Sequence, residues 1–324
     1  MTLLRSREAI LAAALLGLLA LVASRFPAFV APANLTRVFD DTAPLILLAL
    51  GQTVVILTRC IDLSVAANLA LTGMAAAMLN AAFPAVPPVL LLVGAAALGA
   101  LLGAVNGALV WKLAIPPIVV TLGTLTIYRG LVFVLSGGQW INAHEMSAAF
   151  TALPRAQVLG LPALAWIALA AVAAFAALLR YAPLGRAFYA VGGNPAAAVY
   201  AGLDPGRTQF AAFTLSGAVA GLTGYLWVAR YQVAYVDIAR GFELEVVAAC
   251  VIGGISIAGG LGTVAGALLG ALFLGIVKNA LPVVGISPFW QLAIAGAAIV
   301  VAVIANGRAA RRPGRQILRP EAST

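Results

Sequence analysis

Residues 86–110 read VPPVLLLVGAAALGALLGAVNGALV, a run without a single charged side chain. A helix needs about 20 apolar residues to cross the hydrocarbon core of a bilayer, and this run is long enough. The whole chain has the same character: of its 324 residues, 63% are hydrophobic and 9% are charged, and the mean hydropathy is +1.07. Because a soluble domain carries about 25% charged residues, this composition predicts an all-α, polytopic transmembrane helical bundle.

Similar apolar runs recur along the chain and predict about ten spans, within a range of roughly eight to ten. The expected spans are 9–24, 42–58, 63–83, 86–110, 115–135, 161–179, 208–229, 242–258, 263–281 and 289–304. The first run follows basic residues, as in a signal peptide, but the continuing apolar runs favour an uncleaved first span. We therefore expect one transmembrane domain, residues 1–307, and a basic tail, residues 308–324.

The net charge of +9 comes from Lys and Arg in short loops and tails, with the densest run, RAARRPGRQILR, starting at Arg308. In a soluble chain this charge would indicate nucleic acid. Here the positive-inside rule explains it, so a lipid bilayer and no nucleic acid is expected as partner. The same rule predicts cytoplasmic termini, a cytoplasmic segment 181–207 and an external segment 136–160. A break within the membrane at LTRCIDLS, residues 57–64, would change this parity.

Sequence motifs of enzymes are absent. The chain has no G-x-x-x-x-G-K-[ST] loop for ATP, no H-E-x-x-H and no G-x-S-x-G, so no catalytic residue is assigned. Cys60, Cys250 and His144 show no ligand spacing, so no metal site is expected. By elimination, a transporter or channel is favoured over a membrane enzyme.

Residues 185–204, GRAFYAVGGNPAAAVYAGLD, differ from the apolar runs around them. Asn194 suits an N-cap, Pro195 suits the first helical position, and Gly202 suits a left-handed stop. The pattern predicts an isolated helix of about six or seven residues, which would be marginal alone in water. Its small side chains favour docking into a protein groove, and a lipid-skimming connector is the alternative. The candidate docking residues are Gly193, Asn194, Pro195, Ala196, Ala197, Ala198 and Gly202.

Uncharged hydrogen-bonding residues lie within the apolar runs. Such groups line a path for a neutral hydroxylated solute or pair helices with one another, and the sequence leaves both readings open. The residues concerned are Asn68, Asn106, Thr121, Thr124 and Tyr128. Asp62 can pair with Arg59 or cap the next helix. Gly262, Gly266 and Gly270 are spaced by four, which predicts one closely packed helix face.

Several ordered stretches carry a resemblance to a family. They are LALGQTVVILTRCIDLSVAANLALTGM, GALVWKLAIPPIVVTLGTLTIYRGL, GRAFYAVGGNPAAAVYAGLD, SGAVAGLTGYLWVAR and ELEVVAACVIGGISIAGGLGTVAGALLGALFLGIVKNAL. From about Phe39 to Asn306 the chain resembles the membrane permease subunits of bacterial ABC importers for monosaccharides, the ribose, xylose, galactoside and rhamnose group. Autoinducer-2 permeases are near neighbours, and branched-chain amino acid permeases are more distant.

The resemblance implies a role for the short capped helix: it looks like the cytoplasmic coupling segment that docks on an ATPase subunit. That subunit would hydrolyse ATP with Mg²⁺, and this chain would bind no cofactor. The other implied partners are a second permease copy or paralogue and a periplasmic sugar-binding protein, and the implied location is the bacterial inner membrane. Solute would cross by alternating access. A stand-alone secondary carrier is the alternative from another class.

The chain departs from the family pattern at two places. The family often has an acidic residue soon after the Asn of the coupling segment, where this chain has Pro195-Ala196-Ala197-Ala198. It also often has Gly-Gly before I-D-L-S, where this chain has Arg59-Cys60. The Arg-Cys pair is similar to what is expected of rhamnose-type permeases.

Overall fold

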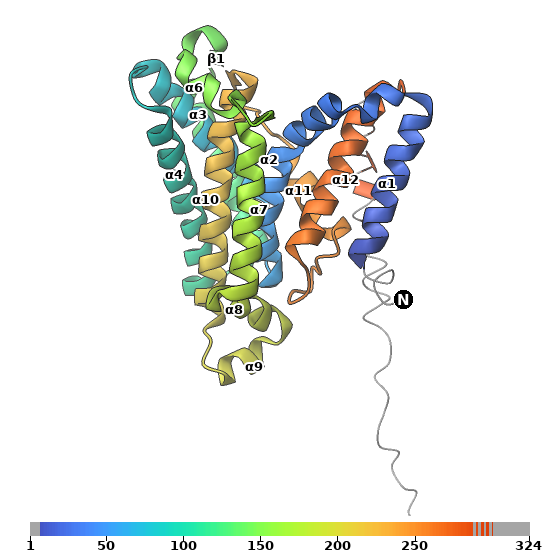
Figure 1. The fold of residues 1–324 in the computed structure, drawn as a ribbon. Coiled ribbons are helices and arrows are strands. Elements are labelled where there is room, and N and C mark those ends of the chain that lie inside the picture. The colour runs from blue at the N-terminus through green and yellow to red at the C-terminus, as the bar shows by residue number, and fades with distance from the viewer. Residues whose placement is uncertain (1–6, 288–289, 291–292, 295, 298–299, 301–324) are drawn as a thin grey trace, which may run out of the picture.

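The computed structural model describes residues 7–287 and the positions 290, 293–294, 296–297 and 300. Within these residues, eight helices are long and apolar enough to cross a membrane, which confirms the predicted all-α polytopic bundle (Figure 1). They are α1 (Arg7–Arg25), α2 (Pro32–Leu57), α3 (Val65–Ala82), α4 (Pro88–Leu113), α5 (Pro117–Ser136), α7 (Ala163–Tyr181), α10 (Pro205–Tyr231) and α12 (Val264–Val283). The predicted last span, 289–304, falls largely outside the described residues, and the basic tail 308–324 falls wholly outside them.

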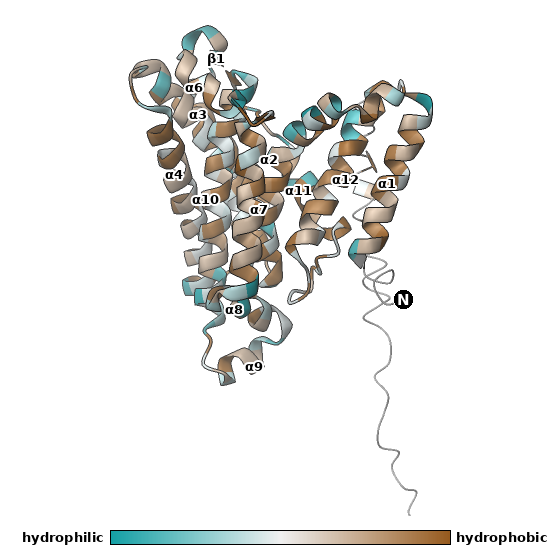
Figure 2. Cartoon of the chain, in the orientation of Figure 1, coloured by the Kyte–Doolittle hydropathy of each residue, from teal (hydrophilic) through white to brown (hydrophobic). Residues whose placement is uncertain are grey.

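Hydrophilic residues gather at the two ends of the bundle, and brown apolar surfaces lie between them (Figure 2). One end carries α8 (Pro183–Gly193) and α9 (Pro195–Tyr200). The opposite end carries short elements, namely η2 (Pro27–Val30), β1 (Ile141–Asn142), η3 (Ala143–Glu145), α6 (Ala148–Ala152), η4 (Leu153–Arg155), β2 (Gln157–Val158), β3 (Leu161–Pro162) and β4 (Val233–Ala234). Segments 181–207 and 136–160 therefore lie at opposite ends, as the charge pattern requires.

Proline fixes where many of the helices begin. Its ring sets a helical φ, and its missing N–H has no partner in the first turn of a helix anyway. Proline stands at the first position of α2, α4, α5, α8, α9 and α10. The seventh predicted span consequently starts at Pro205, where Asp204 accepts a hydrogen bond from the backbone N–H of Arg207 (3.1 Å), and not at Thr208 after a turn.

Helices α4 and α10 pack against each other with almost no side chain between them. A Cβ atom placed on Gly99 of α4 would overlap the carbonyl oxygen of Gly217 of α10, and one on Gly221 would overlap that of Ala95. Small residues let helix backbones approach closely where lipid supplies no hydrophobic driving force. Helices α2 and α3 also pack against α10.

An ion-pair cluster holds α2 to α10 at the end that carries β4. The Arg230 guanidinium donates to Asp40 through Nε (2.9 Å) and to Asp41 through Nη2 (2.6 Å). The arginine and Asp40 side chains are largely buried, with 13% and 12% of their surface exposed. A buried charge needs such partners, so this cluster fixes the position of α2 along the axis of α10.

Two segments interrupt the helices inside the bundle. The predicted span 242–258 is wrong in its length: α11 (Phe242–Ile252) has 11 residues, and segment 253–263 leads without helix to α12. Segment 58–64 likewise separates α2 from α3. The Asn68 amide of α3 donates to the carbonyl of Gly99 near the middle of α4 (3.1 Å), so α3 begins deep in the bundle. The chain reverses direction at segment 58–64. Helix α2 runs from the Arg230 end of α10 to Gln209 at its other end, and α3 then leads back to Ser147 in the segment 136–160.

We predict that Gly99→Val lowers the thermal stability of the detergent-solubilised protein, because the new side chain forces α4 and α10 apart. Overpacking of this kind costs about 1–3 kcal/mol. The matched control is Gly94→Val on the same helix, since nothing lies within 4 Å of a Cβ at Gly94. Melting followed by size-exclusion chromatography checks the pair, and equal midpoints for the two variants would contradict the packing argument.

Candidate coupling site

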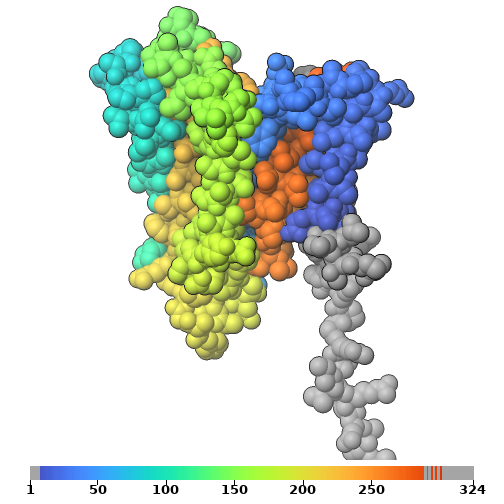
Figure 3. Space-filling model, viewed as in Figure 1, coloured from blue at the N-terminus to red at the C-terminus, as the bar shows by residue number. Residues whose placement is uncertain are grey.

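Among the described residues, helices α8 and α9 project furthest beyond the spans at their end of the bundle, and they are drawn in yellow in the space-filling view (Figure 3). The short helix has the length and cap that the sequence predicts. Its N-cap, Asn194, accepts a hydrogen bond from the backbone N–H of Ala197 through Oδ1 (3.1 Å), and Gly202 takes the left-handed conformation with φ of +81°. Six helical residues lie between these two positions.

The outer face of α9 is uncovered. Ala198 is buried against the rest of the loop, whereas the side chains next to it point outward. Tyr200 is 93% exposed and Val199 is 56% exposed. An aromatic and a β-branched side chain standing in solvent at the tip of a projecting helix are typical of an interaction surface. The outer face of α9 is therefore open to a partner, while Ala198 anchors the helix in its own loop.

The end of α8 is held by a contact that the sequence did not predict. Arg59 donates from Nε to the carbonyl oxygen of Gly192 (2.7 Å) and from Nη2 to that of Gly193 (2.9 Å). Gly260 donates its backbone N–H to the carbonyl of Leu57 (3.0 Å). We call these three backbone stretches, Leu57–Arg59, Gly192–Gly193 and Gly259–Gly260, the glycine junction.

Glycine is required in this junction because the three backbones touch. A Cβ on Gly192 would overlap the carbonyl oxygen of Leu57. One on Gly260 would meet the backbone of Gly193, and Gly260 also has φ of +72°, which side chains rarely adopt. Segment 181–207, the α2–α3 break and the α11–α12 break therefore meet at one point.

Side chains satisfy the backbone of segment 58–64 where helical bonds end. Gln209 of α10 donates to the carbonyl of Thr58 (3.3 Å), and Thr121 of α5 donates to that of Ile61 (3.2 Å). The Gln52 amide lies opposite the N–H and C=O of Asp62, at 3.1 and 3.2 Å, and pairs with both when its oxygen faces the N–H. Backbone groups at membrane depth need such partners because lipid supplies none.

Asp62 lies two residues before Ser64, the N-cap of α3, and its carboxylate closes a turn onto that residue. Its Oδ1 accepts hydrogen bonds from the backbone N–H of Ser64 (2.9 Å) and from the Ser64 hydroxyl (2.6 Å). The Asn106 amide of α4 donates in turn to that hydroxyl (2.8 Å). The alternative pair with Arg59 is not formed, since that guanidinium binds α8.

The predicted polar residues all lie buried between helices. Asn68, Asn106, Thr121 and Tyr128 each donate to a neighbouring element, with Tyr128 reaching the carbonyl of Leu102 (2.8 Å). Thr124 donates to the carbonyl of Val120 within its own helix (3.1 Å). The helix-pairing reading accounts for four of the five contacts, and their place in a solute path stays a prediction.

The predicted glycine face of α12 contains two glycines rather than three. Gly266 and Gly270 lie in the helix and approach the carbonyls of Gly253 and Ala249. Gly262 instead lies in the turn before the helix, with φ of +148°, because Thr263 caps α12 by accepting from the N–H of Gly266 (2.9 Å). The carbonyl of Gly262 accepts from the Tyr189 hydroxyl of α8 (2.8 Å).

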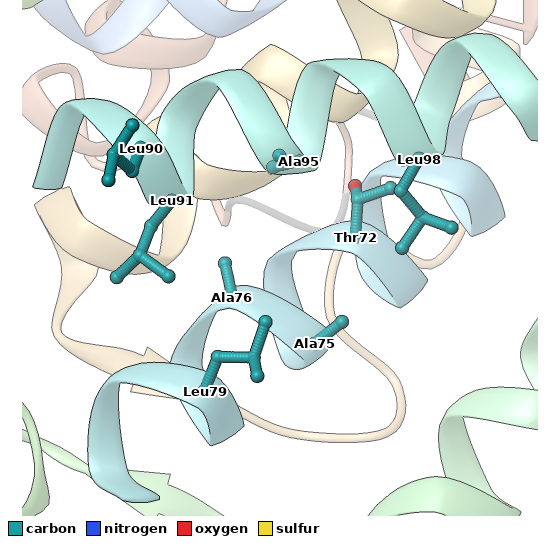
Figure 4. A pocket seen from close by; sticks show the side chains of 9 residues that line it. Thr72, Ala75, Ala76, Leu79, Leu90, Leu91, Ala95 and Leu98 are labelled. Carbon is teal, nitrogen blue, oxygen red and sulfur yellow. The ribbon is translucent and has the colours of Figure 1, made fainter. Parts of the chain in front are cut away.

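Two hollows differ in chemistry. One of about 260 Å³ lies between α3 and α4 and is lined by aliphatic side chains and Thr72 (Figure 4). The Thr72 hydroxyl is already bonded to the carbonyl of Asn68 (2.8 Å), so this hollow lacks the polar groups that a hydroxylated solute needs. The other, of about 270 Å³, lies at the end opposite α9 and is lined by Asp40, Arg155, Gln157, Pro162 and Arg230.

The external segment also carries a stabilised carboxylate. Glu145 accepts from the backbone N–H of Asn142 (2.8 Å), and this bond holds the pKa of Glu145 below its usual range. No group of three or more His, Cys, Asp or Glu side chains able to hold a metal occurs among the described residues. The segment contributes polar surface and charge at the end of the bundle opposite α9.

Comparison with known proteins adds to this geometry. A family model described as branched-chain amino acid transport system / permease component matches residues 34–303. The chain is 38% identical over 308 residues to the autoinducer 2 import system permease protein LsrC of Klebsiella pneumoniae, covering 95% of this chain and 88% of that protein. It is 36% identical over 297 residues to the ribose import permease protein RbsC of Escherichia coli K12, covering 91% and 92%. No solved structure matches it.

We predict that Gly192→Ala disrupts the glycine junction, since the added methyl group has no space beside Leu57. We expect the free energy of unfolding to fall by about 1–3 kcal/mol, which lowers the thermal midpoint. Gly193→Ala is the matched control, because nothing lies within 4 Å of a Cβ at that position. Thermal melting of the two purified variants checks the prediction, which fails if Gly192→Ala melts with the control.

Proposed function

This chain belongs to the family of branched-chain amino acid transport system permease components, and within it we propose that it is the permease of a monosaccharide importer. It is a membrane-spanning subunit of a bacterial ABC importer, located in the inner membrane, and it is not itself an enzyme. The proposal for its solute rests on the two relatives, whose names give autoinducer 2 and ribose. Autoinducer 2 is the alternative solute, and a branched-chain amino acid or a secondary-carrier mechanism is less favoured.

The projecting helix α9 is the observation that carries the proposal. The membrane subunit of an ABC importer receives its energy through a contact with its ATPase, and α9 offers an exposed face, Val199 and Tyr200, at the predicted cytoplasmic end. ATP and Mg²⁺ would be held by that partner. Closure of the ATPase on ATP would shift the equilibrium between two conformations of the permease. The size of the shift would be set by the difference in free energy of ATP binding between the two conformations.

The other partners follow from the rest of the surface. The outer faces of α4 and α5 expose large apolar side chains, among them Leu101, Ile127 and Phe133, and these suit lipid or a second permease. A periplasmic binding protein would deliver solute at the end that carries segment 136–160. Rhamnose is the particular sugar that Arg59-Cys60 favours through the family resemblance.

The test is reconstitution with the genomic neighbours. The tagged chain is co-expressed with them, copurifying proteins are identified, and uptake of labelled ribose, rhamnose, xylose and autoinducer 2 is measured in liposomes with and without ATP. A copurifying ATPase and ATP-dependent uptake of one sugar support the proposal. Uptake by the chain alone without ATP would overturn the importer mechanism, and uptake of autoinducer 2 only would replace the solute.

We predict that Tyr200→Ala weakens capture of the ATPase subunit, because truncating an exposed aromatic anchor removes the largest contact on α9. Interface hot spots cost about 2 kcal/mol or more, roughly 30-fold in affinity. Tyr181→Ala is the matched control, since Tyr181 is 68% exposed at the end of α7 but lies outside α9. Copurification yield and ATP-dependent uptake are the readouts, and equal losses in both variants would argue against docking through α9.

A further inference from the structure

We propose that Arg59 is the positioning residue that links coupling helix α9 to the interrupted helices inside the bundle. The inference rests on the proposed function, because it concerns how movement of α9 reaches the solute path. It assigns to Arg59 the transmission of that movement and assigns docking to α9 itself.

The contacts of Arg59 connect two parts of the chain that are far apart in sequence. Its two bonds to Gly192 and Gly193 join segment 58–64 to a position more than 130 residues further along the chain. Gly193 directly precedes Asn194, the N-cap of α9. A displacement at the first turn of α9 therefore reaches the Arg59 guanidinium through a single residue of backbone.

The guanidinium suits this position by charge and by shape. The carbonyls of Gly192 and Gly193 end helix α8 and carry the partial negative charge of a helix C-terminus. Arginine presents several N–H donors in one rigid plane, and its Nε and Nη2 each bind one of these two oxygens. An ammonium group also has several donors, but it is a point charge without this fixed planar geometry.

The backbone of Arg59 is strained, which indicates that its contacts hold it. Its φ is +65°, a left-handed conformation that is unfavourable for a residue with a side chain. Such conformations persist where the surrounding structure fixes them, and they cluster at functional sites. Gly259 packs directly against the Arg59 side chain with φ of +82°, so the α11–α12 break is in contact with the same residue.

The inner side of segment 58–64 leads to the centre of the bundle. Three residues after Arg59, Asp62 accepts a hydrogen bond from Ser64, the N-cap residue of α3, and Asn106 of α4 donates to the same serine hydroxyl. A displacement of Arg59 is therefore passed to the N-terminus of α3 and to α4. Because the segment is not helical, its backbone can turn without breaking a helical ladder, which makes it the part of the bundle best able to move.

The experiment measures the ratio of solute imported to ATP hydrolysed. The complete complex, with its ATPase and binding protein, is reconstituted in liposomes as wild type, Arg59→Lys and Arg59→Ala. We expect both variants to retain the ATPase subunit and its basal hydrolysis while the ratio falls about tenfold, in the range of ordinary coupling free energies between sites. Arg186→Ala is the control, because Arg186 of α8 donates to the carbonyl of Tyr181 within the same loop (3.0 Å) and reaches no break.

The outcomes separate the two proposals. An unchanged ratio in both Arg59 variants overturns the role of Arg59, while wild-type uptake still supports the importer. Loss of the ATPase subunit from both variants also overturns it, since Arg59 would then support docking rather than transmission. If wild-type complex shows no ATP-dependent uptake, the proposed function itself fails.

A native thiol supplies a second readout that does not depend on transport rate. Cys60 follows Arg59, is 1% exposed, and becomes the sole cysteine when Cys250 is replaced by Ala. We expect its alkylation rate to differ between nucleotide-free and ATP-trapped complex in the Cys250→Ala background. The difference should disappear when Arg59→Lys is added. Two results contradict transmission through Arg59. One is an alkylation rate that is the same with and without nucleotide when Arg59 is intact. The other is a rate that still differs between the two states in the Arg59→Lys variant.

Discussion

The structure depends on one constraint: every backbone polar group within the membrane must find a partner inside the protein. A helix pairs its backbone N–H and C=O groups within itself, but the non-helical segments 58–64 and 253–263 cannot do so. Here the two non-helical segments satisfy it together, because Gly260 donates to Leu57, the last residue of α2. Glutamine and threonine side chains from α2, α5 and α10 supply the rest. The breaks are therefore built features with dedicated partners.

Close approach of backbones is the second device, and it follows from the first. Carbonyls and N–H groups of different segments meet only where no side chain stands between them, so glycine occupies the contact points. The same solution joins α4 to α10 at Gly99 and Gly217 and joins α8 to the breaks at Gly192 and Gly260. The first contact is between two continuous helices and is rigid. The second is between a helix end and two irregular segments, which leaves room for rearrangement.

Much of this architecture could be predicted from local sequence. Apolar length located the spans, and the Asn194-Pro195 pair with Gly202 predicted α9 because caps act within a few residues. The α11 break was missed because residues 246–258 carry no charged side chain, and hydropathy does not report backbone direction. The Gly253-Gly254 pair was the signal available. Gly262 was misplaced since a four-residue spacing does not show where a helix starts. The partner of Arg59 could not be predicted from local sequence. Asp62 lies three residues away and was the expected partner, whereas the observed partner, Gly192, lies 133 residues away.

The placement of α9 between two differently built supports gives its motion a direction. On one side it is joined to the glycine junction through Gly193. On the other, Asp204 begins α10, whose packing against α4 leaves no space for sliding. A short helix that is marginal alone takes its orientation from these two attachments. A force on the exposed face of α9 is therefore transmitted to two different structures. One is α10, which is closely packed along its length, and the other is the glycine junction, which consists of non-helical backbone. We expect movement at the second support, because irregular backbone can exchange its hydrogen-bond partners, whereas sliding α10 past α4 would force two interlocked helices apart.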